Sequence, residues 1–427
     1  MTQTDHAGPA LARRLRTPDA VVIGLGSMIG AGVFVALAPA AEAAGAGLLV
    51  GLLVAGVVAW CNATSSAQLA AQYPSSGGTY FYGRQRLGEW PGFLAGWGFV
   101  VGKTASCAAM ATAFATYAVP TDRWVQRAVA ALAVVALTAV NLRGITRTAR
   151  LTRVLVSLTL VVLAVWTVAV LASGRTSTEG LRLHDVSAYA VLQSAGLLFF
   201  AFAGYARIAT LGEEVVEPER TIPRAVVVAL AGAFAVYAVV AVVALAGAGP
   251  AGLAATATPL VHVTSVVDQG WVSPVVRTGA AVASLGSLLA LLAGVGRTGL
   301  AMAREGDLPR GLARVDPRHQ VPDRVQLVLA AVVVGLVLTV DLRGVIGFSS
   351  FGVLLYYAVA NAAAYTQEPA HRRWPRPVQV LGLLGCLVLV ATLPWTSVVA
   401  GVVVFAVGVL GRTLTRHFWS ARNDGST

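Results

Sequence analysis

Residues 24–32 read Gly-Leu-Gly-Ser-Met-Ile-Gly-Ala-Gly, which puts four glycines into the middle of an apolar stretch. Glycine costs about 1 kcal/mol relative to alanine in a helix interior. Exposed backbone in hydrocarbon costs more, so an interrupted helix is tolerated only where it lines a cavity. The stretch therefore predicts a discontinuous membrane helix whose freed amides receive an anionic group such as a carboxylate. The alternative is close packing of another helix, which the Gly26–Gly30 spacing also fits.

The composition around this stretch indicates a membrane protein. Of 427 residues, 57% are apolar and 12% charged, and the mean hydropathy is +0.74. Soluble proteins carry about 45–50% apolar and about 25% charged residues. These values exclude most soluble classes and favour a protein made mainly of membrane helices. The three cysteines lie in apolar stretches, which favours buried free thiols over disulfides.

Apolar stretches of spanning length recur along the whole chain. A spanning helix needs roughly 20 mostly apolar residues, and the sequence predicts twelve, with the ninth and eleventh short. They are 20–40, 47–71, 91–119, 124–142, 151–172, 188–212, 225–248, 272–302, 325–340, 344–365, 378–393 and 395–413. The predicted fold class is an all-α membrane protein with a transmembrane domain over 20–413, an N-terminal tail over 1–19 and a C-terminal tail over 414–427.

Basic residues set the predicted orientation. The chain has 30 arginines and one lysine, Lys103, and a net charge of +12. With both termini inside, 22 arginines fall in inner segments and 6 in outer ones. By the positive-inside rule, this predicts a multi-pass protein of the cytoplasmic membrane with both tails in the cytoplasm. The arginines punctuate apolar runs and do not form a soluble patch, so no nucleic-acid partner is expected.

The sixth predicted span contains a second irregular stretch. An aromatic cluster begins at Phe199 and is followed by Gly204 and by Arg207, a charge that a lipid-facing helix avoids. Interruptions in the first and sixth spans are typical of an inverted five-plus-five repeat. The repeats would cover about 20–172 and about 188–365, with two extra helices over about 378–413.

Four motifs in register carry a family resemblance. They are residues 26–34, residues 73–80 followed by Gly83 and Arg84, residues 199–205 with Glu213-Glu214-Val215 and Pro218, and Arg297 with residues 301–309. Through them the chain resembles the amino acid–polyamine–organocation (APC) permease superfamily, close to its cationic amino acid transporter branch. The resemblance covers nearly the whole length.

The resemblance implies a fold, a mechanism and a substrate site. The fold would be LeuT-type, with ten core helices plus two and alternating access around a central site. Backbone of the first break would bind a substrate α-carboxylate, carbonyls of the sixth-span break would bind the α-ammonium, and residues 75–80 would re-enter near the inner gate. The implied substrate-binding residues are Gly26, Ser27, Met28, Ile29, Gly30, Gly32, Phe200, Ala201, Phe202, Ala203 and Gly204.

The chain departs from this family at two places. Similar permeases often have a lysine in the fifth span, where Thr159 stands here. Relatives commonly have Gly-Phe-Asp where this chain has Gly204-Tyr205-Ala206, and Arg207 follows. Both departures alter charge near the expected site, so they bear on coupling and on substrate specificity.

Charged and hydroxyl residues within the spans are candidates for coupling or gating. A charge at the bilayer centre costs at least ~2.5–3.5 kcal/mol, so Lys103 is expected to face the interior as a proton carrier or a structural tie. Arg207 keeps its proton and would contact substrate or a coupling anion, or pair with an inner-gate acid. The candidates for that inner-gate acid are Glu213 and Glu214. The hydroxyl groups of Ser284 and Ser287 could bind a sodium ion, or they could serve only in helix packing.

The sequence thus predicts a secondary active transporter of amino acids, proton-coupled or exchanging, with sodium as another possible coupling ion. Two fixed positive charges near the site favour neutral over cationic substrates. A polyamine or organic amine carrier and a non-transporting amino acid sensor are the alternatives. Neither a catalytic triad nor metal-ligand spacing is found in the sequence, so no enzyme, metal or cofactor is expected. The lipid bilayer is the other partner, and the oligomeric state stays open.

Overall fold

The computed structural model describes residues 15–74, 77–144, 149–183, 186–211 and 214–424, with side chains described up to residue 414. Helices dominate this part of the chain, and its one β feature is a parallel bridge between Leu15 and Val215. The α-helices are α1 (Thr17–Met28), α2 (Ala31–Val35), α3 (Leu37–Ala44), α4 (Leu48–Gln72), α5 (Gly78–Leu87), α6 (Glu89–Ala118), α7 (Arg123–Leu142), α8 (Ala149–Ala172), α9 (Ala188–Phe202), α10 (Ala206–Ala209), α11 (Pro218–Ala254), α12 (Pro259–Val266), α13 (Ser273–Arg304), α14 (Asp323–Thr339), α15 (Leu342–Tyr365), α16 (Arg376–Thr392) and α17 (Trp395–Asp424). Short 3-10 turns are η1 (Gly45–Gly47), η2 (Thr178–Leu181), η3 (Gly270–Val272), η4 (Arg310–Ala313) and η5 (Pro369–His371).

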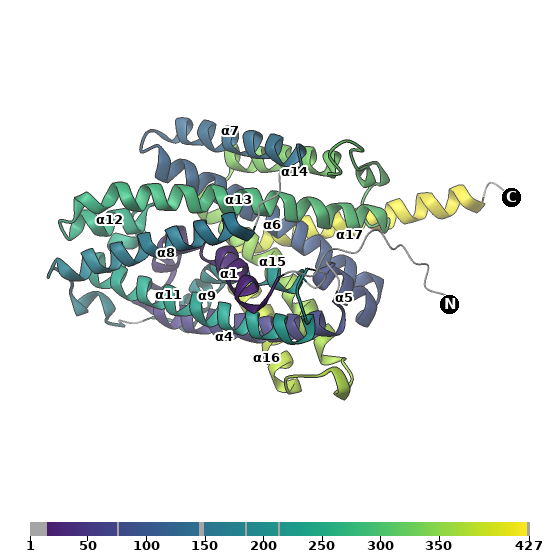
Figure 1. The fold of residues 1–427 in the computed structure, drawn as a ribbon, viewed down its shortest axis with the longest axis horizontal. Helices are drawn as coiled ribbons and strands as arrows, with labels where there is room; N and C mark the ends of the chain where they lie inside the picture. The colour runs from purple at the N-terminus through teal and green to yellow at the C-terminus, as the bar shows by residue number, and fades with distance from the viewer. Residues whose placement is uncertain (1–14, 75–76, 145–148, 184–185, 212–213, 425–427) are drawn as a thin grey trace.

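The long helices run along the long axis of one bundle (Figure 1). The short helix α12 lies at one end, here called the α12 end, and α5 lies toward the opposite end, here called the α5 end. Nine helical segments within the described residues are long and apolar enough to cross a membrane. The helices α9 and α16 are apolar but shorter, with 15 and 17 residues, and α14 has 17 residues. The multi-pass membrane architecture is therefore present, with nine long spans against the twelve predicted.

Small residues bring the central helices together. A Cβ atom on Gly98 of α6 would lie 2.7 Å from the carbonyl oxygen of Gly352 on α15. A Cβ atom on Gly102 would lie 2.9 Å from the carbonyl oxygen of Ser349. These distances leave no room for a side chain, as in other membrane helices that meet through small residues. The close approach fixes the segment of α6 that carries Lys103 inside the bundle.

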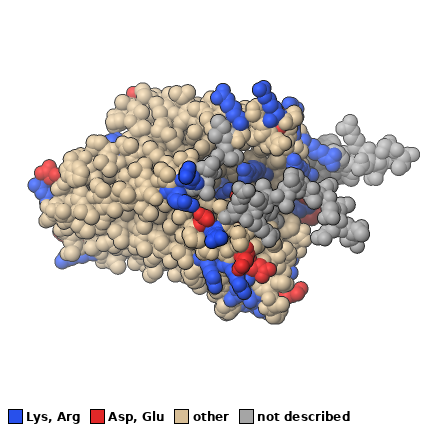
Figure 2. All heavy atoms as spheres, in the orientation of Figure 1, with Lys and Arg blue, Asp and Glu red and all other residues tan. Residues whose placement is uncertain are grey.

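The surface matches a membrane environment. Large apolar side chains are exposed on the outer helices, including Leu132 on α7 and Val402 and Val407 on α17. On the face drawn in Figure 2, uncharged residues cover a broad band toward the α12 end. A few charges mark the tip of that end, and most basic side chains gather toward the α5 end. Lipid tails can cover such a band without burying an unpaired charge.

Candidate functional site

The first helical break follows Met28. Ile29 leaves the helical region at φ −80° and ψ 68°, Gly30 lies at φ −120° and ψ −136°, and α2 begins at Ala31. The amide of Ile29 donates to the Leu25 carbonyl oxygen at 2.6 Å, and the amide of Gly30 donates to that of Met28 at 2.8 Å. Two of the amides predicted to receive a carboxylate thus have partners within the chain. The first amide groups of α2 have no acceptor within that helix, because the N–H groups in the first turn of any α-helix make no hydrogen bonds inside the helix.

The second break separates α9 from α10. The helix α9 ends at Phe202, and a turn over residues 203–205 leads into α10. The Tyr205 amide donates to the Phe202 carbonyl oxygen at 3.4 Å, so only a weak bond closes the turn. The Phe200, Phe202 and Ala203 side chains are buried, as is Ala201. This break therefore exposes peptide groups within the packed interior of the bundle.

The two breaks are in direct backbone contact. A Cβ atom on Gly204 would lie 2.1 Å from the Ser27 carbonyl oxygen and 2.6 Å from the Met28 nitrogen. A Cβ atom on Gly32 would lie 2.8 Å from the Cα of Ala201. No residue larger than glycine fits either position without moving a helix. The predicted stretches, 174 residues apart in sequence between Gly30 and Gly204, therefore lie against each other.

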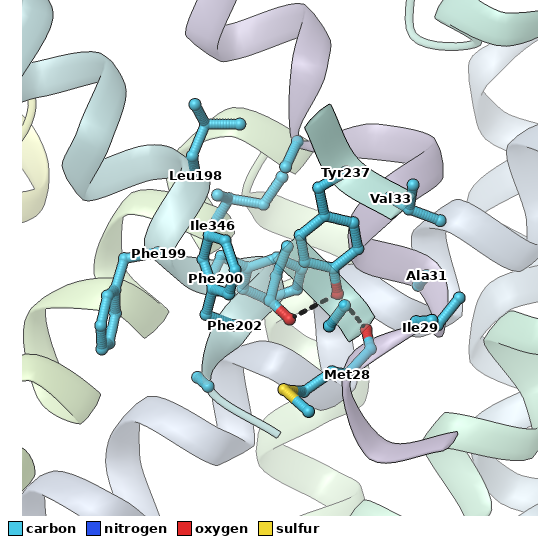
Figure 3. Packing of buried hydrophobic residues seen from close by; sticks show 14 of the residues in the cluster. Met28, Ile29, Ala31, Val33, Leu198, Phe199, Phe200, Phe202, Tyr237 and Ile346 are labelled. Carbon is cyan, nitrogen blue, oxygen red and sulfur yellow. Dashed lines mark hydrogen bonds between the residues drawn. The ribbon is translucent and has the colours of Figure 1, made fainter. Parts of the chain in front are cut away.

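Tyr237 of α11 bridges the two breaks (Figure 3). Its hydroxyl lies 2.7 Å from the Met28 carbonyl oxygen and 3.0 Å from the Ala201 carbonyl oxygen. Its ring packs edge-on against Phe202, with the ring centroids 5.0 Å apart. Sequence reasoning missed this residue, although a lone tyrosine inside the apolar run of the seventh span was a visible signal. The structure places its hydroxyl between the two breaks.

Lys103 reaches the second break from α6. Its side-chain nitrogen donates to the Ala203 carbonyl oxygen at 2.9 Å, and the residue is buried. The Tyr357 hydroxyl donates to the same oxygen at 3.3 Å, and its ring stacks on Tyr205 with the centroids 4.8 Å apart. The Ala203 carbonyl group, which is predicted to bind the ammonium group of a substrate, thus accepts a hydrogen bond from the ammonium group of Lys103. Among the described residues, no carboxylate forms an ion pair with Lys103.

The hydroxyl residues predicted as coupling candidates differ in what their side chains contact near the first break. A Cβ atom on Gly30 would lie 2.2 Å from Ser287 Oγ, so this hydroxyl faces the break. Ser284 Oγ is buried and has no hydrogen-bond partner among the described residues. Thr159 donates to the Leu155 carbonyl oxygen of its own helix at 2.8 Å. Gly26 of α1 packs against α8, where an added Cβ atom would lie 2.5 Å from Val156.

The predicted gate charges do not form an ion pair in the described part of the chain. Arg207 of α10 is exposed and donates to Thr210 Oγ1 at 3.2 Å. No ion pair within 4 Å joins Glu214 to Arg207. Glu213 lies outside the described residues. The carbonyl of Glu214 accepts the Leu15 amide at 3.0 Å, which ties the start of the chain to this segment.

The described residues contain no cluster of three or more His, Cys, Asp or Glu side chains that could hold a metal ion. Cys61, Cys107 and Cys386 are buried free thiols. The chemistry within reach at the two breaks is therefore that of peptide groups, hydroxyls and one ammonium. Such groups can bind a small zwitterion by hydrogen bonds and charge.

Comparisons with known proteins point to transport. A sequence model of the amino acid permease family matches residues 15–411. An uncharacterized transporter of Mycobacterium tuberculosis is 60% identical over 412 residues, covering 95% of this chain and 93% of the relative. The branched-chain amino acid permease BcaP of Bacillus subtilis is 25% identical over 430 residues, covering 94% and 92%. Cationic amino acid transporter 7, chloroplastic, of Arabidopsis thaliana is 26% identical over 431 residues, covering 92% and 73%. These matches indicate a transporter and not an enzyme.

Proposed function

Because the chain belongs to the amino acid permease family, we propose that it is a secondary active transporter of amino acids across the cytoplasmic membrane. It works by alternating access within a twelve-span LeuT-type arrangement, with both termini in the cytoplasm. The short helices α9, α14 and α16 supply the three spans beyond the nine long ones. The relatives named for branched-chain and cationic amino acids support this substrate class.

The contact between the two breaks is the observation that carries the proposal. Irregular backbone is tolerated at membrane depth only where protein or a water-filled cavity surrounds it. Here Gly204 touches the backbone of Ser27 and Met28, and Tyr237 bridges both breaks. A substrate that enters between the breaks would exchange these internal hydrogen bonds for its own carboxylate and ammonium bonds. Binding would thereby change how α1 and α9 pack.

Lys103 supplies a means of proton coupling. Its ammonium donates to Ala203 at the second break, and loss of a proton would weaken a charge-assisted bond. Protonation of Lys103 and the packing of the second break are thereby linked. The structural alternative is a permanent tie between α6 and the break.

Sodium coupling is the second candidate, because Ser284 Oγ is buried without a partner in the described chain and Ser287 faces Gly30.

Uptake into proteoliposomes tests the proposal. The purified protein is reconstituted and given labelled amino acids of neutral, acidic and cationic types, together with a polyamine. We expect accumulation of at least one amino acid when an inward pH gradient is imposed, or exchange when the lumen is preloaded. Uptake driven by sodium alone would contradict proton coupling. Binding without accumulation or exchange would favour a sensor, and uptake restricted to the polyamine would favour the amine carrier.

A further inference from the structure

Lys103 places an ammonium group deep inside the bundle. It is the fifteenth of the 30 residues of α6, so at 1.5 Å per residue it lies about 20 Å from either end of that helix. Only 6% of the residue is exposed. A charge taken out of water destabilises the fold unless an anion or a full set of hydrogen bonds compensates it.

Hydrogen bonds within the described chain compensate this charge only in part. An ammonium group has three donors. Lys103 Nζ makes one hydrogen bond among the described residues, to the Ala203 carbonyl oxygen at 2.9 Å. That oxygen also accepts the Tyr357 hydroxyl at 3.3 Å, so Lys103 shares its acceptor.

The described chain supplies no carboxylate to Lys103. None of its ion pairs within 4 Å includes this residue. Each acidic residue that the structure describes lies in a loop or within the first or last three residues of a helix. The titratable groups beside Lys103 are Cys107, one turn along α6, and Tyr357, and neither a thiol nor a phenol is a strong acid at neutral pH.

Lys103 lies where the two helical breaks meet. Its acceptor belongs to the peptide group that leads into Gly204, and a Cβ atom there would lie 2.1 Å from the Ser27 carbonyl oxygen. At the first break, the amides of Ile29 and Gly30 donate to carbonyl groups of their own chain. Fewer amides therefore remain for a carboxylate than the sequence predicts, and a cation stands next to them.

We propose that Lys103 binds a carboxylate of the transported substrate and thereby selects the class of molecule that enters between the breaks. The carboxylate accepts a hydrogen bond from the Lys103 ammonium, and the substrate's own ammonium donates to the Ala203 carbonyl oxygen in its place. One internal bond is exchanged for two charge-assisted bonds. An amine without a carboxylate is repelled by the same charge. This inference rests on the proposed function, because it names the chemistry of that substrate.

An amino acid has two sources for this carboxylate. The α-carboxylate is common to all amino acids, so Lys103 would then select amino acids over other amines. The side-chain carboxylate belongs only to acidic amino acids, and Lys103 would then select those. Ligand pairs that differ in one of the two groups separate these sources.

Binding to the purified full-length protein tests the assignment. The rise of the melting temperature in detergent with ligand concentration gives a Kd for each ligand. Alanine with alaninamide and leucine with leucinamide report on the α-carboxylate, and glutamate with glutamine reports on the side-chain carboxylate. Putrescine is the amine without a carboxylate.

The variants remove or keep the charge at one position. Lys103→Met removes it and keeps an unbranched side chain, whereas Lys103→Arg keeps it. Thr104→Val on the same helix is the matched control, because the Thr104 hydroxyl donates to the Val100 carbonyl oxygen of α6 at 2.6 Å. Glu213→Gln is included because Glu213 lies outside the described residues.

In the natural protein we expect the carboxylate of at least one pair to bind at least about tenfold more tightly than its amide. Lys103→Met should lower this ratio about tenfold, the size of one hydrogen bond to a charged group. Lys103→Arg should retain part of the ratio, and Thr104→Val and Glu213→Gln all of it. If Lys103→Met fails to fold, Lys103→Gln makes the same comparison, since its amide can still donate to Ala203.

The inference is overturned if no carboxylate is preferred to its amide, or if the charge-removing variant leaves the ratio unchanged. It is also overturned if putrescine binds as tightly as the amino acids. A higher ratio in Glu213→Gln would contradict it too, because an acid that neutralises Lys103 would compete with the substrate.

Two results separate this inference from the proposed function. Amino acid uptake into proteoliposomes, with a carboxylate preference that does not depend on Lys103, would sink the inference and leave transport standing. Carboxylate binding that depends on Lys103, with neither uptake nor exchange of any amino acid, would do the reverse.

Discussion

At the scale of single residues, one glycine decides whether the two helical breaks can meet. Gly204 lies against the Ser27 carbonyl group, and an added Cβ would overlap both its carbon and its oxygen, at 2.3 and 2.1 Å. Backbone atoms cannot move aside as the end of a flexible side chain can. The contact that carries the proposed function therefore depends on the absence of a single methyl group.

We expect Gly204→Ala to reduce uptake at least about tenfold, because separating the breaks by even 1 Å misplaces the binding groups. The measurement is initial uptake rate in proteoliposomes at matched protein content. Gly335→Ala on α14 is the control, since an added Cβ there meets no atom within 4 Å. Equal rates for Gly204→Ala and Gly335→Ala would contradict the assignment of the breaks to the site.

Tyr237→Phe removes the hydroxyl that bridges Met28 and Ala201 and keeps the ring. An unsatisfied buried acceptor costs about 1–3 kcal/mol, so we expect a lower melting temperature in detergent and a slower uptake rate. Tyr189→Phe is the control, because that tyrosine is exposed and its hydroxyl has no hydrogen bond among the described contacts. A Tyr237→Phe protein as stable and active as the natural one would show that the bridge is dispensable.

Lys103→Met tests the proposed coupling and keeps an unbranched side chain of similar length. We expect residual uptake to respond little to a pH gradient, because no proton can bind at this position. The rate is measured from pH 5.5 to 8.5 with and without the gradient, and Lys103→Arg, which keeps its charge throughout, serves as the comparison. Unchanged transport and pH dependence in Lys103→Met would reject the proton-carrier role.

At the scale of helices, a buried ionic cluster attaches the last helix to the α5 end. Asp307, just after α13, accepts hydrogen bonds from Tyr80 at 2.8 Å, Arg84 at 3.0 Å and Arg412 at 2.7 Å. Arg412 of α17 packs against the rings of Trp90 and Phe93, with its guanidinium carbon 4.3 and 4.8 Å from the ring centroids. Three parts of the chain far apart in sequence, α5, the residue after α13, and α17, thus meet at one carboxylate. The cluster thereby ties α17 to α5 through Asp307.

We expect Asp307→Asn to destabilise the protein strongly, since removing one partner of a buried ion pair costs about 3–5 kcal/mol. The Asp307 and Arg412 side chains are fully buried, so solvent screens the pair little. Melting in detergent and the resistance of α17 to protease report the effect. Glu219→Gln, at an exposed position on α11, is the control and should leave both readouts unchanged.

At the scale of the whole molecule, the proposed orientation places the α5 end in the cytoplasm. Cys61, Cys107 and Cys386 are buried, so a membrane-impermeant thiol reagent should leave the natural protein unlabelled. In intact cells we expect Thr121→Cys, in the loop before α7, to be labelled, and Arg318→Cys, in the loop before α14, to be protected until the cells are opened. The reverse pattern would invert the topology.

Much of the fold could be predicted from the sequence, because the signals for it are local. Hydropathy alone predicted long apolar helices, and the glycines of residues 24–32 predicted an interruption that the structure places after Met28. The aromatic and glycine pattern after Phe199 likewise marks the turn at residues 203–205. Predicted span ends differ from the helices by several residues, since hydropathy does not record where a cap or turn ends a helix.

The sequence by itself determined the membrane class, the family and the two places where helices break, since each follows from composition or from residues adjacent in the chain. Only the tertiary structure decided that Gly204 touches Ser27, that Tyr237 bridges the breaks, and that Lys103 donates to Ala203. These contacts join residues at least 36 positions apart. Their formation depends on how helices pack, which small residues permit but do not specify.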